Sequence, residues 1–446
     1  MIPYLFKKQN GFTIVELTVV VVAIGVLAAL AIVGYNGVQD RAREVSIKSD
    51  LENASGQLQR DYQKTGNYPV ALTDSNDGGG LASSPNTVYT YLLKGNTYCL
   101  SATSSKGNVN SFYVRGDDTK IKSGVCQLDV TTFAGTGVAG FANGTVTTAQ
   151  FGLPYGIVED SLGNIYVADQ GYSTIRKIDT DGNVTNFAGT YSTGFVNGTG
   201  AAARFNQPKG LAIDSANNIY VADCSNNSIR KISPGGVVST FAGSGTAGAA
   251  DGTGVAAQFT CPTGITVDQS NIVYVTSGHT IRKITPAGVV TTFAGSGTAG
   301  SANGTGVAAQ FNNPVDLAIN GSGDMYVVES SANRIRKISP TAVVTNYAGS
   351  GSNGFNDGVL LGARFDQPAG IAIDKSGTIY VADTNNRRIR KVLPSGVTTY
   401  AGNGTGGRVD GPAASAQFSG PNSVYVTQKG TLLISDSINR VIRKIQ

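Results

Sequence analysis

The stretch PAGIAIDKSGTIYVADTNNRRIRKV, residues 368–392, decides most of the fold. Runs of β-branched and aromatic residues occur in it and directly after it, at 370–374, 378–382, 388–392 and 397–401. The segments between them, such as Lys375-Ser376-Gly377 and Pro394-Ser395-Gly396, have the composition of hairpin turns. The stretch therefore predicts four short antiparallel strands.

The same pattern recurs as an internal repeat. A start near Pro-x-Gly, a middle near Ile-Tyr-Val-Ala-Asp and an end near Ile-Arg-Lys-Ile are recognisable in six copies, which begin 52 to 54 residues apart. The anchoring prolines are Pro154, Pro208, Pro262, Pro314, Pro368 and Pro421. Six copies of a four-stranded unit predict an all-β six-bladed propeller over residues 130–446.

These copies resemble NHL-repeat propellers. The segments at the place of the motif that names that family are Asn226-Asn227-Ser228-Ile229, Gly278-His279-Thr280-Ile281 and Asn386-Arg387-Arg388-Ile389. The last copy ends without a fourth strand, while an extra strand at 130–135 precedes the first copy. An unclosed ring would leave an exposed sheet edge, so we expect strand 130–135 to close the propeller by completing the last blade.

The first forty residues have a different character. Lys7 and Lys8 precede Gly11, and no charged residue occurs between residues 17 and 35. Nineteen helical residues span about 28 Å, close to the hydrocarbon thickness of a membrane. The only obvious processing signal lies before this apolar run instead of after it, so the run is predicted to stay in the mature protein as a membrane-spanning helix.

This segment resembles the N-terminus of type IV pilins and pseudopilins, because Phe12 follows Gly11 and Glu16 is the fifth residue after Gly11. The resemblance implies cleavage after Gly11 by a prepilin peptidase and methylation of the new amine on Phe12. It also implies that Glu16 pairs with the N-terminal amine of a neighbouring subunit during assembly. A carboxylate without a partner in an apolar setting costs on the order of several kcal/mol, so pairing with an amine is favoured.

The predicted domains are a leader at 1–11, an assembly helix at 12–66, a small pilin-like α+β subdomain at 67–126 and the propeller at 130–446. After residue 35 the helix becomes amphipathic, with Val38, Val45, Leu51 and Leu58 on a stripe that is expected to dock on a small sheet. The breaker Gly66-Asn67-Tyr68-Pro69 predicts its end.

The four cysteines fall into two local pairs. Cys99 and Cys126 are expected to tie the end of the small subdomain to its middle strand, a connection common in pilin-like domains. Cys224 and Cys261 lie in loops that an up-and-down propeller brings to one face, which favours a disulfide between adjacent blades, although two separate buried thiols remain an alternative. An exported domain folds in an oxidising environment, in which both disulfides can form.

Three kinds of recurrent residue in the propeller invite a functional interpretation. Asp169, Asp223, Glu329, Asp383 and Asp436 recur at one position, which favours turn capping over a metal centre. The Arg-Lys pairs, such as Arg176-Lys177, are interpreted as solvated or blade-bridging charges. The long connections between blades carry Phe141, Phe195 and Phe355, which either form a binding face or merely fix their loops.

Composition limits the function classes. In residues 130–446, 22 Lys and Arg face 18 Asp and Glu, so no nucleic-acid binding is expected. His279 is the only histidine and falls on a repeat position, and the propeller's only glutamates are Glu159 and Glu329. These counts argue against a propeller lactonase or lyase, and we expect no enzyme activity, no cofactor and no metal.

The favoured function is a minor or modular pilin-like protein that displays its propeller for adhesion or partner recognition. A pseudopilin of a type II secretion or DNA-uptake system is the alternative, and a surface-tethered propeller enzyme is the third hypothesis. The expected partners are the prepilin peptidase, other pilin subunits, the pilus assembly machinery, the membrane and an unknown surface ligand, either protein or glycan. The expected location is the membrane before assembly, then the cell surface or an extracellular pilus.

Overall fold

The fold was analysed in a computed structural model of the chain. It describes residues 14–69, 72–76, 78–94, 97–105, 110–116, 118–123 and 126–446. Contacts divide the chain into two compact units, Met1–Cys126 and Gln127–Gln446, which are described one at a time.

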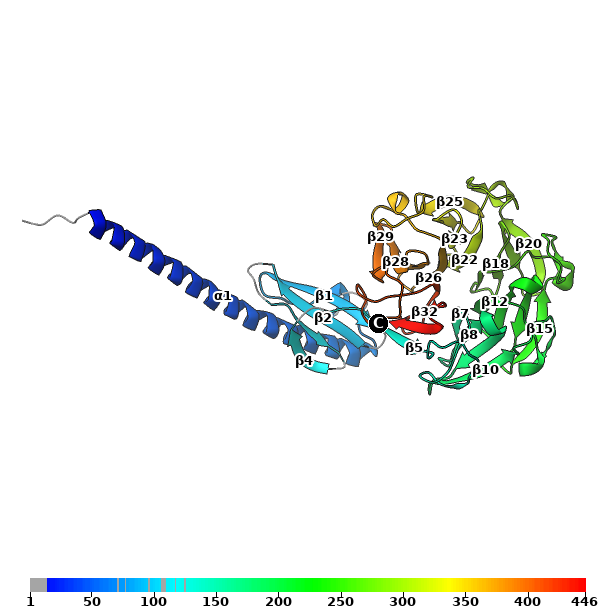
Figure 1. The fold of residues 1–446 in the computed structure, drawn as a ribbon, viewed down its shortest axis with the longest axis horizontal. Coiled ribbons are helices and arrows are strands. Elements are labelled where there is room, and N and C mark those ends of the chain that lie inside the picture. The colour runs from blue at the N-terminus through cyan, green and yellow to red at the C-terminus, as the bar shows by residue number, and fades with distance from the viewer. Residues whose placement is uncertain are drawn as a thin grey trace, which may run out of the picture. The chain divides into compact units, whose positions relative to one another are not determined.

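The first unit joins one long helix to a small antiparallel sheet (Figure 1). Its elements are α1 Ile14–Thr65, the 3₁₀ helix η1 Leu72–Asp74, β1 Thr87–Lys94, β2 Thr97–Ser104, β3 Phe112–Arg115 and β4 Asp118–Ser123. The helix ends one residue before Gly66, whose φ of +73° favours glycine. The strands follow one another in the order β1-β2-β3-β4, as a simple meander.

The sheet covers only the later part of α1. Ile47, Leu51 and Leu58 are buried against β2 and β3, together with Tyr98 and Phe112. The predicted stripe is wrong at its beginning, because Val38 and Val45 are 67% and 68% exposed. Within the described residues, no helix includes a segment long and apolar enough to span a bilayer.

Two disulfides are present, one in each unit. Cys99 in β2 is bonded to Cys126, and Cys224 is bonded to Cys261. The second bond links the residue after strand Ile219–Asp223 of the second repeat to the loop before strand Ile265–Val267 of the third repeat. Both pairs are those that the sequence favoured.

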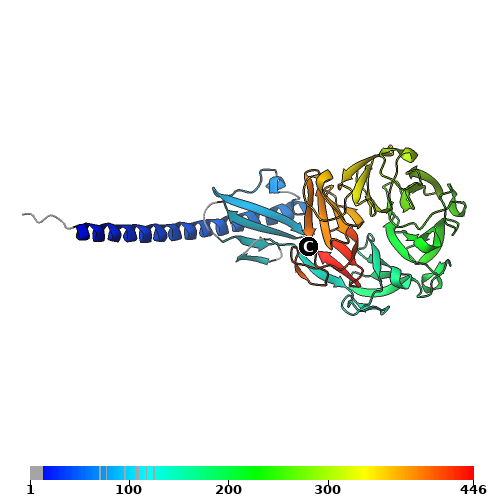
Figure 2. The same cartoon turned by 45° about the horizontal axis from the view of Figure 1, so that its top comes forward.

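The second unit, described throughout, consists of six sheets that match the six sequence repeats (Figures 1 and 2). We number these sheets as blades one to six and give the strands of each from the innermost outward. Blade one has β7 Pro154–Glu159, β8 Ile165–Asp169, β9 Thr174–Ile178 and β10 Asn183–Gly189, and blade two has β12 Pro208–Ile213, β13 Ile219–Asp223, β14 Ser228–Ile232 and β15 Val237–Ala242. Blade three has β17 Ile265–Val267, β18 Val273–Ser277, β19 Thr280–Ile284 and β20 Val289–Ala294, and blade four has β22 Pro314–Ile319, β23 Met325–Glu329, β24 Arg334–Ile338 and β25 Val343–Ala348. Blade five has β26 Pro368–Ile373, β27 Ile379–Asp383, β28 Arg388–Leu393 and β29 Gly396–Ala401, and blade six has β31 Pro421–Val426, β32 Leu432–Asp436, β33 Val441–Ile445 and β5 Asp129–Ala134.

Short additional elements lie in the loops between blades and in turns within blades. Two-residue strands pair with the outermost strand of five sheets: β6 Gly144–Thr145, β11 Gly198–Thr199, β16 Gly252–Thr253, β21 Gly304–Thr305 and β30 Gly411–Pro412. The 3₁₀ helices are η2 Gln170–Tyr172, η3 Gly200–Ala202, η4 Cys224–Asn226, η5 Gly254–Ala256, η6 Gly306–Ala308 and η7 Leu360–Gly362. The repeat pattern predicted the four long strands of each sheet, but not these pieces.

The strand that precedes the first repeat lies in the last sheet. β5 is antiparallel to β33, with Val130 opposite Ile445 and Ala134 opposite Ile442. The six innermost strands β7, β12, β17, β22, β26 and β31 contact one another in this order, and β31 contacts β7. Adjacent blades approach closely at Gly156, where a Cβ atom would come within 2.5 Å of the Lys209 carbonyl oxygen of the next blade.

Candidate functional site

The structure does not reach the residues predicted for processing. Gly11 and Phe12 lie outside the described residues. Glu16 belongs to the first turn of α1, but its side chain is likewise outside the described part of the chain. The roles of these three residues therefore remain predictions from the sequence.

The recurrent arginines of the propeller are buried. Each blade has one on its third strand, and all six are 0% exposed: Arg176, Arg230, Arg282, Arg336, Arg390 and Arg443. The prediction of solvated charges is wrong for them, whereas their bonds to the loops that connect adjacent blades agree with the blade-bridging alternative. Each guanidinium lies 5.2–5.4 Å from the centre of a buried Phe ring and donates a hydrogen bond of 2.7–2.9 Å to a loop carbonyl. The loop between blades covers this face of the sheet, so the arginine is sealed from water.

The recurrent acids are the partners of these arginines. Five blades have a fully buried acid whose distance to the arginine ranges from 2.6 Å at Asp383–Arg390 to 3.9 Å at Asp169–Arg176. Each acid also accepts a backbone N–H from the preceding loop, as Asp383 does from Asp366 at 2.8 Å. Burial raises the pKa of Asp223 to about 6 against the opposing effect of these donors. The acids thus combine a bond to the preceding loop with a buried ion pair, whereas Asp169 and Asp223 make no side-chain capping bond to the turn that follows them, so the predicted turn capping is wrong for these two.

In blade three the recurrent acid is missing, and the buried arginine pairs with an acid from another segment. Ser277 replaces the acid and accepts the loop N–H of Thr260 at 2.8 Å. Arg282 is paired instead with Asp251 of the loop between blades, at 2.7 Å. Each blade thus supplies at least one carboxylate to its buried guanidinium, which is what burial of a charge requires. We assign this cluster to stability, not to ligand binding.

The predicted binding-face aromatics are anchored to the same clusters. The rings of Phe141, Phe195 and Phe355 lie 4.9–5.0 Å from the guanidinium carbons of Arg176, Arg230 and Arg390. Phe195 and Phe355 nevertheless remain 43% and 45% exposed. These phenylalanines therefore fix their loops and also present part of each ring to solvent.

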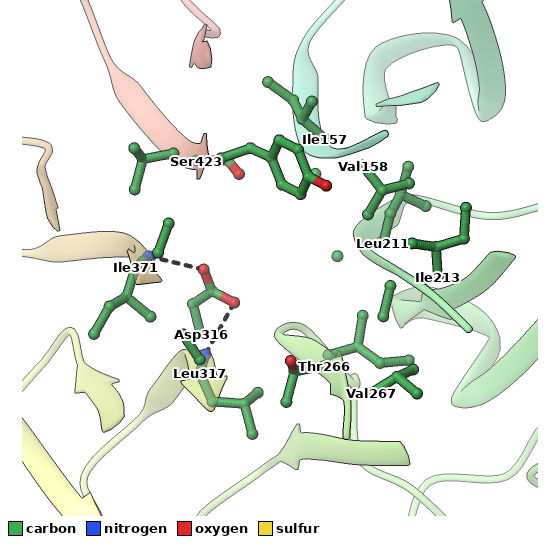
Figure 3. A pocket seen from close by; sticks show the side chains of 18 of the residues that line it. Ile157, Val158, Leu211, Ile213, Thr266, Val267, Asp316, Leu317, Ile371 and Ser423 are labelled. Atoms are coloured by element: carbon green, nitrogen blue, oxygen red, sulfur yellow. Dashed lines mark hydrogen bonds between the residues drawn. The ribbon is translucent and has the colours of Figure 1, made fainter. Parts of the chain in front are cut away.

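The axis of the propeller contains a cavity of about 240 Å³ (Figure 3). It is lined mainly by apolar side chains of the innermost strands, among them Ile157, Leu211 and Val267. Asp316 of blade four lies on its wall and accepts hydrogen bonds from the backbone N–H groups of Leu317, at 2.9 Å, and Ile371 of blade five, at 3.0 Å. Its surroundings raise the pKa of Asp316 to about 7 because burial outweighs these two donors.

Asp316 is a residue that the sequence interpretation missed. It occupies the third position of the Pro-x-Gly start, where four of the six copies have Gly156, Gly210, Gly264 and Gly370. A comparison of the copies at this position would have found it. Within the described ranges, no three His, Cys, Asp or Glu side chains are grouped as metal ligands.

Two parts of the chain match known sequence families. Residues 6–32 match the prokaryotic N-terminal methylation motif, which is the type IV pilin signal. Residues 205–232 and 365–392 match the NHL repeat. The chain therefore joins a type IV pilin signal to NHL repeats in one polypeptide.

Curated relatives resemble the propeller part. Protein SUPPRESSOR OF QUENCHING 1 of Arabidopsis thaliana is 28% identical over 324 residues, which are 67% of this chain and 31% of that protein. NHL repeat-containing protein 2 of Bos taurus is 29% identical over 335 residues, or 65% of this chain and 46% of that protein. Teneurin-4 of Homo sapiens is 28% identical over 355 residues, or 69% and 12%. The chain spans less than half the length of each of these relatives.

Solved structures share the fold. A protein of unknown function from Bacteroides thetaiotaomicron superposes with a TM-score of 0.58 at 15% identity, covering 81% of this chain and 98% of that one. An auxiliary nutrient binding protein from Bacteroides ovatus gives a TM-score of 0.56 at 18% identity with the same two coverages. At such identities the likeness concerns the fold alone.

Proposed function

From this union of a type IV pilin signal with an NHL-repeat propeller, we propose that the chain is a minor or modular pilin-like protein that presents a binding propeller at the cell surface. Prepilin peptidase cleaves after Gly11, the new amine of Phe12 is methylated, and residues 17–35 hold the precursor in the membrane. The observation that carries the proposal is the occurrence of the methylation motif at 6–32 in the same chain as six propeller blades.

The surface of α1 supports an assembly role. Val21, Val22 and Val26 are 62%, 59% and 55% exposed, and Val38 and Val45 are more exposed still. Leaving a valine in water forgoes about 1.5–3 kcal/mol relative to burying it. A lipid bilayer before assembly, and neighbouring helices after it, would cover this surface.

The size of the propeller favours sparse placement. The second unit spans residues 127–446, whereas the first unit ends at Cys126. A module of that size on every subunit would crowd a tightly packed filament, so a minor subunit or a tip position is preferred. The other pilin subunits and the pilus assembly machinery are then the partners of the first unit, and adhesion or recognition is the task of the second.

Binding is preferred to catalysis because the one acid among the described residues that line the axial cavity is already engaged. Both oxygens of Asp316 accept backbone N–H groups. Ser423, which occupies the same repeat position in copy six, is 8% exposed. The acid that a reaction in this cavity would use as its base is thus held by two backbone donors.

Immunogold labelling of intact cells with antibody against residues 130–446 tests the proposal. We expect label on filaments or their tips, and a shift of the label to the cell membrane in a Gly11→Val variant that blocks cleavage. A Gly321→Ala variant, altered in a propeller turn where a Cβ atom would meet nothing within 4 Å, serves as the expression control. Label that stays on the membrane in the wild type would overturn display on a filament and favour a pseudopilin.

A further inference from the structure

Departures from the repeat converge at one place on the surface of blade one. Phe141 and Tyr172 have ring centres 5.9 Å apart, and Tyr172 and Tyr191 are separated by the same distance. The three residues come from three segments: the loop before blade one, the turn η2 and the loop after blade one. We call them the aromatic row.

Tyr172 replaces a residue that supports the fold in other blades. At its repeat position three copies have Asn226, Asn386 and Asn439, and each asparagine donates to the buried acid of its blade and to a loop carbonyl. Blade one forgoes this clamp, and the backbone N–H groups of Gly152 and Leu153 satisfy Asp169 instead. Blade one therefore lacks the asparagine clamp at the position that Tyr172 occupies.

Gly152 is a second departure that accommodates the first. The other copies have Asn206, Thr260, Asn312, Asp366 and Ser419 at its position. A Cβ atom on Gly152 would lie 2.7 Å from Cδ2 of Tyr172, which is too close for any side chain. The glycine and the tyrosine are thus a matched pair found in blade one.

Tyr191 is the third departure. The other five loops have a glycine at this position, with φ between +83° and +90° at Gly137, Gly245, Gly297, Gly351 and Gly404. Tyr191 is 70% exposed, so burial of its ring contributes little to stability. Packing of the loop alone does not explain a large aromatic side chain there.

The chemistry of the row defines its ligand. The segments 134–141, 170–173 and 188–196 contain no Asp, Glu, Lys or Arg, and Arg176 beneath Phe141 is entirely buried. The charged side chains beside these segments are cations, since Arg408 donates to the Thr136 carbonyl and Arg204 lies against Gly194. Tyrosine offers an apolar ring face with a hydroxyl at its edge and loses little conformational entropy on binding. A pyranose has the complementary form, with C–H groups on its faces and hydroxyls around its rim, and no charge.

We propose that the aromatic row binds a neutral carbohydrate chain, with successive sugars stacked on successive rings. Successive ring planes are inclined by 52° and 35°, so the row is twisted and fits a flexible soluble chain better than a flat crystalline surface. The proposal deepens the surface-recognition function above and rests on it for its biological setting, but binding itself requires no filament.

Isothermal titration calorimetry on the full chain tests the proposal. The protein is kept in a detergent without a sugar headgroup and is titrated with cellohexaose, chitohexaose and laminarihexaose, with hexagalacturonate as the acidic counterpart. We expect at least one neutral hexasaccharide to bind. Tyr191→Ala and Tyr172→Asn should each weaken binding by about tenfold or more, which is ~1.4 kcal/mol.

Ile438→Ala is the control, because this apolar side chain is 64% exposed in the turn after the second strand of blade six and belongs neither to the aromatic row nor to the predicted binding face. Its affinity should stay within about twofold of the wild type, and thermal melting checks that all variants fold. The proposal would be overturned if no neutral hexasaccharide binds, if hexagalacturonate binds more tightly than they do, or if Tyr191→Ala binds as well as the wild type. It would also be overturned if the row binds a protein, in a Tyr191-dependent way, and no carbohydrate. Because the titration is independent of filament labelling, either result leaves the display function to its own test.

Discussion

Blades one and five have the same four strands but use their loops differently. Blade five has the full repeat: Arg390 lies 2.6 Å from Asp383 and 2.5 Å from Asp357, and Asn386 clamps the acid. In blade one the pair Arg176–Asp169 is 3.9 Å long, and the clamp position holds Tyr172. The difference teaches that the repeated residues maintain the fold, whereas residues that break the repeat mark surfaces free to acquire a function.

The largest effect is expected from the buried arginine of blade five. Arg390→Met leaves the fully buried carboxylate of Asp383 and the partly exposed one of Asp357 without their cation, which should cost about 3–5 kcal/mol of unfolding free energy. Arg176→Met should cost less, because Arg176 lies 3.9 Å from Asp169, whereas Arg390 lies 2.6 Å from Asp383. Urea unfolding of both variants measures the difference, and equal losses would contradict the contrast between the two blades.

Asp316 should make the propeller's stability depend on pH. Its folded-state pKa of about 7 lies above the 3.8 of an exposed carboxyl, so its contribution is full below about pH 4 and is lost as the pH rises through 7. Asp316→Asn removes this titration. The unfolding free energy of the wild type should therefore fall by about 2 kcal/mol more than that of the variant between about pH 4 and pH 8, after a discount for exposure to the cavity. Parallel pH profiles would show that Asp316 does not titrate in this range.

Gly152 and Tyr172 should be energetically coupled. Gly152→Ala places a methyl group against the Tyr172 ring and should cost about 1–3 kcal/mol, as overpacking does. In a Tyr172→Asn background the same change should be nearly neutral, because the ring is gone and the repeat's own residue is restored. A double-mutant cycle by thermal unfolding measures the coupling. A cost that is the same in both backgrounds would mean that the two departures are unrelated.

The smallest effect on stability is expected at Tyr191. Tyr191→Gly restores the residue of the other five loops and removes a ring that is 70% exposed, so the unfolding free energy should change by no more than about 0.5 kcal/mol. A loss above 1 kcal/mol, on the order seen for buried contacts, would show that the ring maintains its loop. That outcome would remove the distinction between structural and functional positions.

The sequence predicted the regular parts of the fold because they depend on local pattern. Strand runs, turn residues and the six-fold period defined the blades, and the unpaired run at 130–135 indicated its place beside the last strand. The pair Cys224–Cys261 could be placed because the repeat fixes which loops share a face, whereas Cys99–Cys126 was expected from the resemblance to pilin-like domains. These features need only the order of residues and the geometry of hairpins.

Features that depend on tertiary surroundings were missed or misjudged. The alternation of strand neighbours does not reveal that a loop and a Phe ring cover Arg176 and its equivalents, so the sequence left open whether these charges are solvated or bridge blades. Val38 and Val45 fit the helical stripe, but the sheet does not extend far enough to cover them. Phe141 was identified as a candidate contact residue because its position varies among the repeats. Tyr172 and Tyr191 were missed, because they come next to Phe141 only when separate segments of the chain approach one another.

Mass spectrometry of the protein sheared from cell surfaces tests the central claim most directly, namely that the pilin pathway delivers this propeller. The account predicts an N-terminal peptide that begins with N-methylated Phe12, in a polypeptide that still contains propeller peptides such as residues 388–392. A surface protein that retains residues 1–11, or one cleaved after the apolar run at 17–35, would contradict it.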